Sequence, residues 1–148
     1  MAVTSVHTSA SPEAVWAVLA DGWTYSNWVV GTSHMRAVET AWPQRGSRLF
    51  HASGLWPAVR RDESVVEESE PARRLVITAK ARPFGEARVS VTLAPEGTGC
   101  RITIEEHPSA GPGRWVHNPA ADRVLKHRND EALARLATLA ERRQRPVD

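Results

Sequence analysis

Histidine is the side chain that most readily moves a proton near neutral pH, and the sequence contains six histidines. They are dispersed, no two have the helical spacing of zinc ligands, and no HExxH motif occurs, so the sequence predicts no metal site. His51 differs from the others because it follows Leu49 at strand spacing, which places both side chains on one face. If that face is concave, His51 could accept a proton from a bound molecule or donate one to it.

Arg60 and Asp62 also lie two residues apart in a predicted strand and therefore share a face. As a polar pair, His51 and Arg60 could move protons or stabilise an enolate. The alternation does not fix whether this face is concave, so a surface position is the alternative. The sequence has neither a G-x-S-x-G nucleophile elbow nor a G-x-G-x-x-G phosphate loop.

Length and composition are typical of one domain spanning residues 1–148. The net charge of +2 is too small to indicate a nucleic-acid partner, and no segment approaches the run of about 18 apolar residues that a membrane span needs. Cys100 is the only cysteine, which excludes an internal disulfide and fits a reducing compartment. The N-terminal residues do not have a signal-peptide pattern. We expect a cytoplasmic protein without a cofactor, either a monomer or a homodimer.

The elements that would position these side chains begin with a strand over residues 2–8. Ser11 is a helix N-cap, Pro12 suits the first helical position, and Asp21-Gly22 ends the predicted helix. Residues 23–30 predict a second short helix, because they are too apolar for a solvated loop.

Six segments of strand length follow between Gly31 and Pro108, separated by Gly and Pro turns. Two of them alternate clearly between apolar and polar residues, with Ala87, Val89, Val91 and Leu93 on one face of the first and Cys100, Ile102 and Ile104 on one face of the second. One buried and one solvated face are typical of an antiparallel sheet.

A long helix is predicted from Pro119, capped by Asn118, to Arg142 or Arg143. Its apolar stripe consists of Ala121, Leu125, Ala132, Leu136 and Ala140. Between Leu125 and Ala132 the stripe passes through Arg128 or Asn129. Facing a cavity, such a side chain could hold a ligand's carbonyl or hydroxyl; alternatively, these residues pair with solvent or with a strand carboxylate such as Glu105 or Glu106.

The order of elements predicts an α+β fold in which a curved seven-stranded antiparallel sheet wraps around one long C-terminal helix, with two short helices between the first two strands. Sheet and helix would touch at one end and diverge at the other, which leaves a cavity.

This order resembles the SRPBCC superfamily (START-like, Bet v 1-like), and within it the bacterial polyketide cyclase/dehydrase and lipid-transport branch. The likeness is carried by SPEAVWAVLAD (11–21), YSNWVVGTSHMRAV (25–38), WPQRGSRL (42–49), residues 69–106 and GPGRWVHNP (111–119). The resemblance implies a helix-grip fold with a deep hydrophobic cavity. Members bind lipids, sterols or aromatic polyketides, and some cyclise polyketides.

The resemblance also places the short second helix at the cavity rim, where Tyr25 and Trp28 would offer apolar ring surface to a ligand. Trp16 and Trp23 are expected to pack the two helices onto the sheet, and Trp28 is expected to form the cavity wall.

Two functions follow from this reading. The first is binding of a hydrophobic small molecule (a lipid, a sterol-like or an aromatic polyketide-like compound) with Tyr25, Trp28, His51, Arg128 and Asn129 as candidate ligand contacts. The alternative is an enzyme of the polyketide cyclase/dehydrase type that acts in the same cavity, with His51 and Arg60 as candidate catalytic residues.

Overall fold

The computed structural model describes residues 2–30, 32–53, 60–81, 85–110 and 119–144. The strands are β1 (Ala2–Thr8), β2 (Thr32–Val38), β3 (Arg48–Ser53), β4 (Arg60–Glu70), β5 (Arg74–Ala81), β6 (Gly85–Glu96) and β7 (Gly99–Ala110). The helices are α1 (Pro12–Ala20), the 3₁₀ turn η1 (Gly22–Thr24), α2 (Tyr25–Trp28) and α3 (Pro119–Gln144). The two short helices lie between β1 and β2, as predicted.

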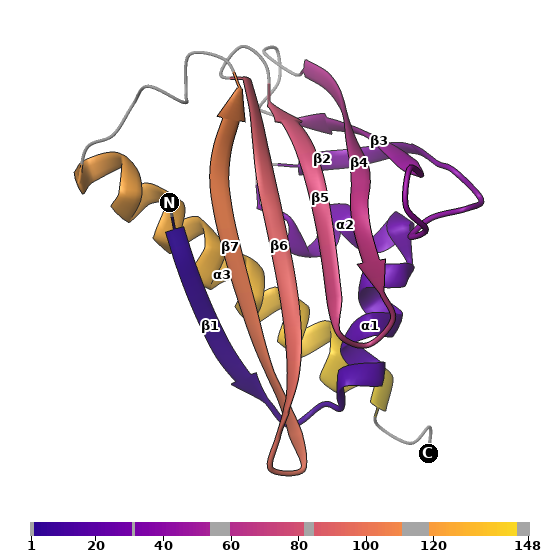
Figure 1. The fold of residues 1–148 in the computed structure, drawn as a ribbon, viewed down its shortest axis with the longest axis vertical. Coiled ribbons are helices and arrows are strands. Elements are labelled where there is room, and N and C mark those ends of the chain that lie inside the picture. Colours follow the sequence, from indigo (N-terminus) through magenta and orange to yellow (C-terminus); the bar gives the residue numbers. More distant parts are fainter. Residues whose placement is uncertain (1, 31, 54–59, 82–84, 111–118, 145–148) are drawn as a thin grey trace.

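The seven strands form one antiparallel sheet in the order β1-β7-β6-β5-β4-β3-β2. The sheet is curved, and α3 crosses its concave side diagonally (Figure 1). The predicted α+β helix-grip architecture is therefore confirmed. The turns of the β4–β5 and β6–β7 hairpins lie at the same end of the sheet, called the hairpin end below (Figure 1). β4 and β6 begin at the opposite end, called the upper end (Figure 1).

The local signals in the sequence account for the helix boundaries. The Ser11 side chain accepts a hydrogen bond from the backbone N–H of Ala14 at 3.1 Å, and Pro12 opens α1. Pro119 begins α3, which continues to Gln144. The predicted cap Asn118 lies outside the described residues, as does the side chain of Ala121.

Apolar packing fills the concave side near the hairpin end. Leu75, Val91 and Ile102 from the sheet are buried against α1 and the C-terminal half of α3 in a core that also includes Val15, Val18, Leu19, Val66, Leu93, Leu133, Leu136 and Ala140. A hydrogen bond from Thr8 Oγ1 to Glu141 Oε1 (2.8 Å) ties the end of α3 to β1. Because burial of apolar area is the main stabilising term, this end is the anchor of the fold.

The concave face is less completely covered toward the upper end. On β5, Ile77 is buried whereas Ala79, two residues further on, is partly exposed. On β6, Val91 is buried whereas Val89 and Ala87 are partly exposed. Because residues two apart on a strand share a face, exposure rises along one continuous surface. The concave face is therefore packed at the hairpin end and partly exposed toward the upper end.

The expectation that Trp23 packs the short helices onto the sheet is wrong, and the turn between α1 and α2 shows why. Gly22 takes the buried place in this turn, where an added Cβ would come within 2.6 Å of Val38 Cγ1 and 3.1 Å of Trp42 Cδ1. The next side chain points outward, and Trp23 is 58% exposed. Trp42 occupies the interior instead, and its indole N–H donates to the Leu19 carbonyl at 3.0 Å.

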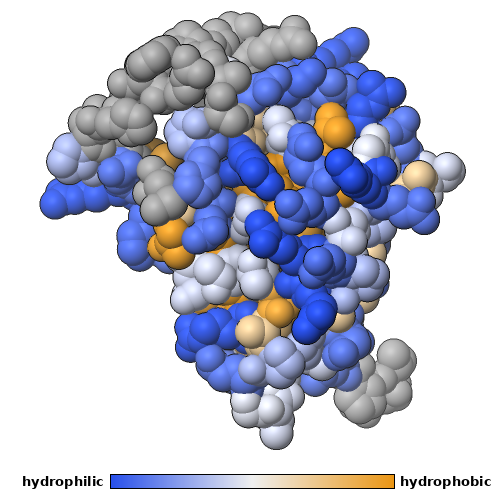
Figure 2. Space-filling view, in the orientation of Figure 1, coloured by the Kyte–Doolittle hydropathy of each residue, from blue (hydrophilic) through white to orange (hydrophobic). Residues whose placement is uncertain are grey.

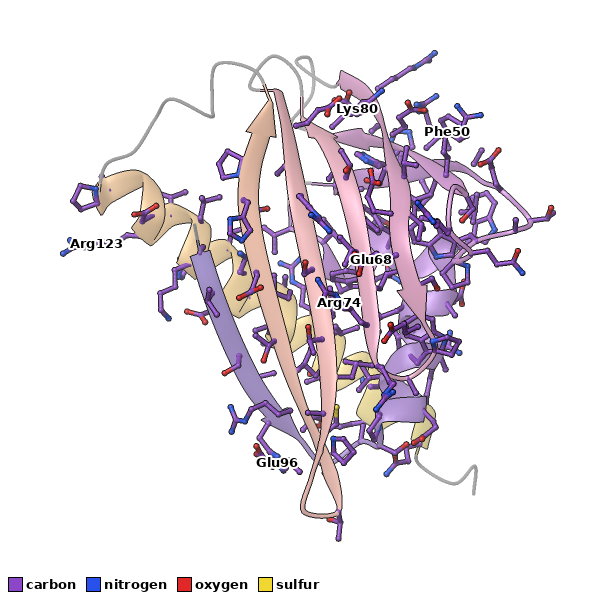
Figure 3. The ribbon with its side chains drawn as sticks, viewed as in Figure 1. Phe50, Glu68, Arg74, Lys80, Glu96 and Arg123 are labelled. Carbon is purple, nitrogen blue, oxygen red and sulfur yellow. The ribbon has the colours of Figure 1, made fainter. Side chains whose placement is uncertain are left out.

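The outer face of the sheet is mainly hydrophilic (Figure 2). Glu68 forms ion pairs with Arg74 (3.4 Å) and Arg88 (3.3 Å), and Lys80 pairs with Glu63 at 2.8 Å. Figure 3 shows Glu68 and Arg74 over the middle of the sheet, with Lys80 toward its upper end. Exposed pairs of this kind contribute little stability, so we do not place the function on this face. No helix among the described residues is long and apolar enough to cross a membrane.

Candidate functional site

A chain of three hydrogen-bonding side chains lies buried on the concave face. The Ser64 hydroxyl oxygen lies 3.1 Å from the Tyr25 phenol oxygen and 3.2 Å from His51 Nε2. The Tyr25 and His51 rings are stacked, with centroids 5.4 Å apart. All three residues are buried. The hydroxyl of Ser64 therefore links a phenol and an imidazole in one hydrogen-bonded row.

Three elements bring these side chains together. Tyr25 begins α2, which packs against α3 and β2. His51 pairs with Asp62 across β3 and β4, and Leu49 pairs with Ser64. Because these four residues share the concave face, the predicted common face of Leu49 and His51 is confirmed and is directed inward.

Burial sets the protonation state of this row. It raises the pKa of Tyr25 to about 12, an effect that the Ser64 hydrogen bond opposes and the nearby Glu106 carboxylate reinforces. It also lowers the pKa of His51, against the attraction of Asp62 and together with the repulsion of Arg36. Tyr25 is therefore a neutral phenol at physiological pH, and His51 is predominantly a neutral imidazole.

The ion pair between Glu106 on β7 and Arg128 on α3 faces the same region. Arg128 Nη2 lies 2.6 Å from Glu106 Oε1 and 2.5 Å from Oε2, so one guanidinium nitrogen binds both carboxylate oxygens. The Glu106 side chain is 9% exposed and that of Arg128 is 40% exposed. Of the two readings left open for Arg128, pairing with a strand carboxylate is the one that the structure shows.

A surface recess of about 500 Å³ lies on the outer side of this ion pair, lined by Val30, Arg123, Val124, His127, Arg128 and Glu131. Arg123 marks its position near the beginning of α3 (Figure 3). Arg128 therefore lines this recess and also binds the buried carboxylate of Glu106.

Asn129 follows Arg128 on the buried side of α3. It is 5% exposed and lies one helical turn before the core residues Ala132 and Leu133. Its amide nitrogen has no hydrogen-bond partner among the described residues. Leaving such a donor buried and unsatisfied costs about 1–3 kcal/mol.

The structure brings most of the sequence-predicted site residues into one region. Trp28 is buried in the core, with its ring edge against Tyr25 at a centroid distance of 5.5 Å. Tyr25, His51, Arg128 and Asn129 form or adjoin the groups above, whereas the side chain of Arg60 lies outside the described residues. Whether any of them contacts a ligand stays a prediction.

Ser64 is the residue that the sequence reading missed. Asp62, Ser64 and Val66 share the inner face, but the sequence has valines at both 65 and 66, so alternation alone could not show which face of this strand is buried. Among the described residues, no group of three or more His, Cys, Asp or Glu side chains could hold a metal ion.

Comparison with known proteins identifies the family. The family model described as polyketide cyclase / dehydrase and lipid transport matches residues 2–141. The chain belongs to this family. The SRPBCC resemblance is thereby confirmed over nearly the whole chain. No functionally curated protein matches the sequence.

Several solved structures share the fold of this chain. Protein NE0264 from Nitrosomonas europaea is 17% identical with a TM-score of 0.72, and the match covers 96% of this chain and 94% of that one. Ara h 8.0201 is 10% identical with a TM-score of 0.71, covering 95% and 96%. The di-domain ARO/CYC StfQ from the steffimycin biosynthetic pathway is 14% identical with a TM-score of 0.70, covering 95% of this chain and 50% of StfQ. At these identities the likeness shows the fold alone.

Proposed function

We propose that the protein binds a hydrophobic small molecule between the concave face of the sheet and α3. The observation that carries this proposal is the gradient along the concave face, which is packed at the hairpin end and partly exposed at Ala79, Ala87 and Val89. Small side chains at the first two positions leave room for a guest. Family membership supports the same reading.

The chemistry of this surface suits an apolar ligand with few polar groups. Burying apolar area contributes about 25 cal/mol per Å², so ring or chain contacts would supply most of the affinity. Tyr25, Ser64 and His51 offer hydrogen bonds that would fix the ligand's orientation. Lipids, sterol-like compounds and aromatic polyketide-like compounds meet this description.

A thermal-shift screen against these three classes tests the proposal. A ligand that binds only the folded protein raises its melting temperature, and we expect at least one class to do so. Ala87→Trp fills the partly exposed inner position and should abolish the shift. Ala94→Trp, on the outer face of the same strand, is the matched control and should retain it. No shift with any class, or a shift that A87W leaves intact, contradicts the proposal.

The Tyr25–Ser64–His51 row favours a second candidate function, catalysis of the polyketide cyclase/dehydrase type. A neutral imidazole could take up a proton from a carbon next to a ligand carbonyl, with Ser64 relaying it. Tyr25, whose pKa of about 12 keeps it protonated, would turn its O–H from Ser64 to the developing enolate oxygen.

Exchange of the α-hydrogens of a bound ketone with deuterated solvent, followed by NMR, tests this candidate. Exchange faster than in buffer, slowed by His51→Gln and by Ser64→Ala, supports an enzyme. If the ketone binds but its α-hydrogens exchange only at the rate seen in buffer, catalysis is rejected and ligand binding stays the proposed function.

A further inference from the structure

Apart from Tyr25 and Cys100, whose pKa values burial raises, the ionisable side chains buried in the described residues are Asp62, Glu106 and His51. The buried polar residues are Thr4, Thr8, Ser47, His51, Asp62, Ser64, Ser90, Glu106 and Asn129, and no described lysine or arginine is buried. A ligand carboxylate or phosphate entering here would lose its hydration shell without meeting a buried cation in this part of the chain. Desolvating such an anion is costly unless a cation pairs with it.

Among the described residues, Arg128 is a guanidinium that faces this region, and it is already engaged. Both oxygens of the buried Glu106 bind its Nη2 atom. To hold an anionic ligand, Arg128 would have to release a carboxylate that is itself buried. The second anion would gain little from an already neutralised partner.

Asn129 favours a ligand with an acceptor oxygen, and a neutral oxygen meets it without the cost of desolvating a charge. Its amide nitrogen is buried on the inner stripe of α3 and has no partner among the described residues. A neutral carbonyl, ester or ether oxygen would accept that N–H and remove its desolvation penalty. A hydrocarbon would leave the donor unsatisfied.

From these two observations we infer that the ligand is an uncharged apolar molecule carrying an acceptor oxygen, and that Asn129 is the residue that selects this oxygen. The inference rests on the proposed function, because it concerns the same space between sheet and helix. It deepens that function by excluding free acids, including fatty acids, from the ligand class.

Three naphthalenes of nearly equal size test the inference: 2-acetylnaphthalene, 2-ethylnaphthalene and 2-naphthoate. Their dissociation constants are measured at pH 7.5 by tryptophan fluorescence and calorimetry. We expect the ketone to bind about tenfold more tightly than the hydrocarbon, the usual range for satisfying a buried donor. The carboxylate should bind more weakly than either.

Asn129→Leu separates selection from a structural role. In this variant the advantage of the ketone over the hydrocarbon should disappear, while the melting temperature of the ligand-free protein is unchanged or raised. Asn27→Leu, which changes an exposed asparagine on α2, is the matched control and should keep the tenfold preference. Comparing the binding free energies of the ketone and the hydrocarbon for wild type and N129L forms a double-mutant cycle. This cycle isolates the contact between Asn129 and the ligand oxygen.

Naphthoate as the tightest ligand, or a ketone preference that survives in N129L, would overturn the inference. These results differ from failure of the proposed function. Binding of 2-ethylnaphthalene that A87W abolishes supports the binding site whatever the preference for oxygen. Loss of all three ligands, together with no shift for any class in the screen, would reject the site and the inference with it.

Discussion

Replacing Arg128 with methionine would leave the buried carboxylate of Glu106 without its partner. The two contacts of 2.5 and 2.6 Å would be lost, while the Glu106 side chain, 9% exposed, would stay largely out of water. Breaking a fully buried pair costs about 3–5 kcal/mol. Because Arg128 is 40% exposed, water already screens part of the interaction, and we expect R128M to lower the free energy of unfolding by about 2 kcal/mol.

Removing the other partner of the ion pair should lower the free energy of unfolding by less. Glu106→Gln removes the charge at the buried end, and water can still solvate the half-exposed guanidinium, so we expect a loss of about 1 kcal/mol or less. The double variant E106Q/R128M has no isolated buried charge and should recover most of the stability that R128M loses. The structure thus predicts an asymmetry between the single variants and a favourable coupling in the double one.

Urea unfolding at pH 7.5, followed by circular dichroism and tryptophan fluorescence, measures all four proteins. The reasoning is refuted if R128M loses less than about 0.5 kcal/mol, the range of an ordinary surface substitution, or if E106Q is the more destabilised single variant.

Three further predictions concern His51, Gly22 and the tryptophans. Because burial lowers the pKa of His51 from 6.5, the unfolded chain binds a proton there first, so unfolding free energy should fall as pH drops below about 6.5. In urea titrations at several pH values, the unfolding free energy of His51→Gln should fall less steeply with decreasing pH than that of the wild type. The exposed control His127→Gln should fall as steeply as the wild type, and equal slopes for wild type and H51Q would contradict the prediction. Gly22→Ala should destabilise by about 1–3 kcal/mol in thermal unfolding because its methyl would overlap neighbouring side chains, and an unchanged melting temperature would show that the turn adapts. By the same measurement Trp28→Ala should cost about 3–5 kcal/mol and Trp23→Ala less than about 0.5 kcal/mol; the opposite order would be incompatible with their burial.

The parts of the fold that the sequence predicted are those with local causes. Ser11 and Pro12 start a helix through a cap and a fixed backbone angle, and the alternation from Ala87 to Leu93 identifies the inner face of β6. These signals act over a few residues. From β2 to β7 each hairpin joins strands that are neighbours in the sequence, whereas the pairing of β1 with β7 joins distant segments and has no local signal.

The site was predicted less completely because its contacts join residues far apart in the chain. Tyr25 meets Ser64 of β4 only after α2 has packed against α3 and β2, and Arg128 meets Glu106 only once α3 lies across β7. Trp23 was misplaced for a related reason. Its type favours burial, but the close packing of Gly22 decides which side of the turn faces inward.

The buried polar side chains occupy positions at which apolar ones would stabilise the empty protein better. Asn129 interrupts a helix stripe that continues through Ala132 and Leu133, and its amide nitrogen is unsatisfied in the described structure. Ser64 lies between Leu49 and Ala79 in one row of the sheet. Stability alone does not favour such residues; polar groups in a packed interior are expected where a binding partner completes their hydrogen bonds. We therefore expect that replacing such a polar residue, as in Asn129→Leu, stabilises the ligand-free protein and makes it less selective among ligands.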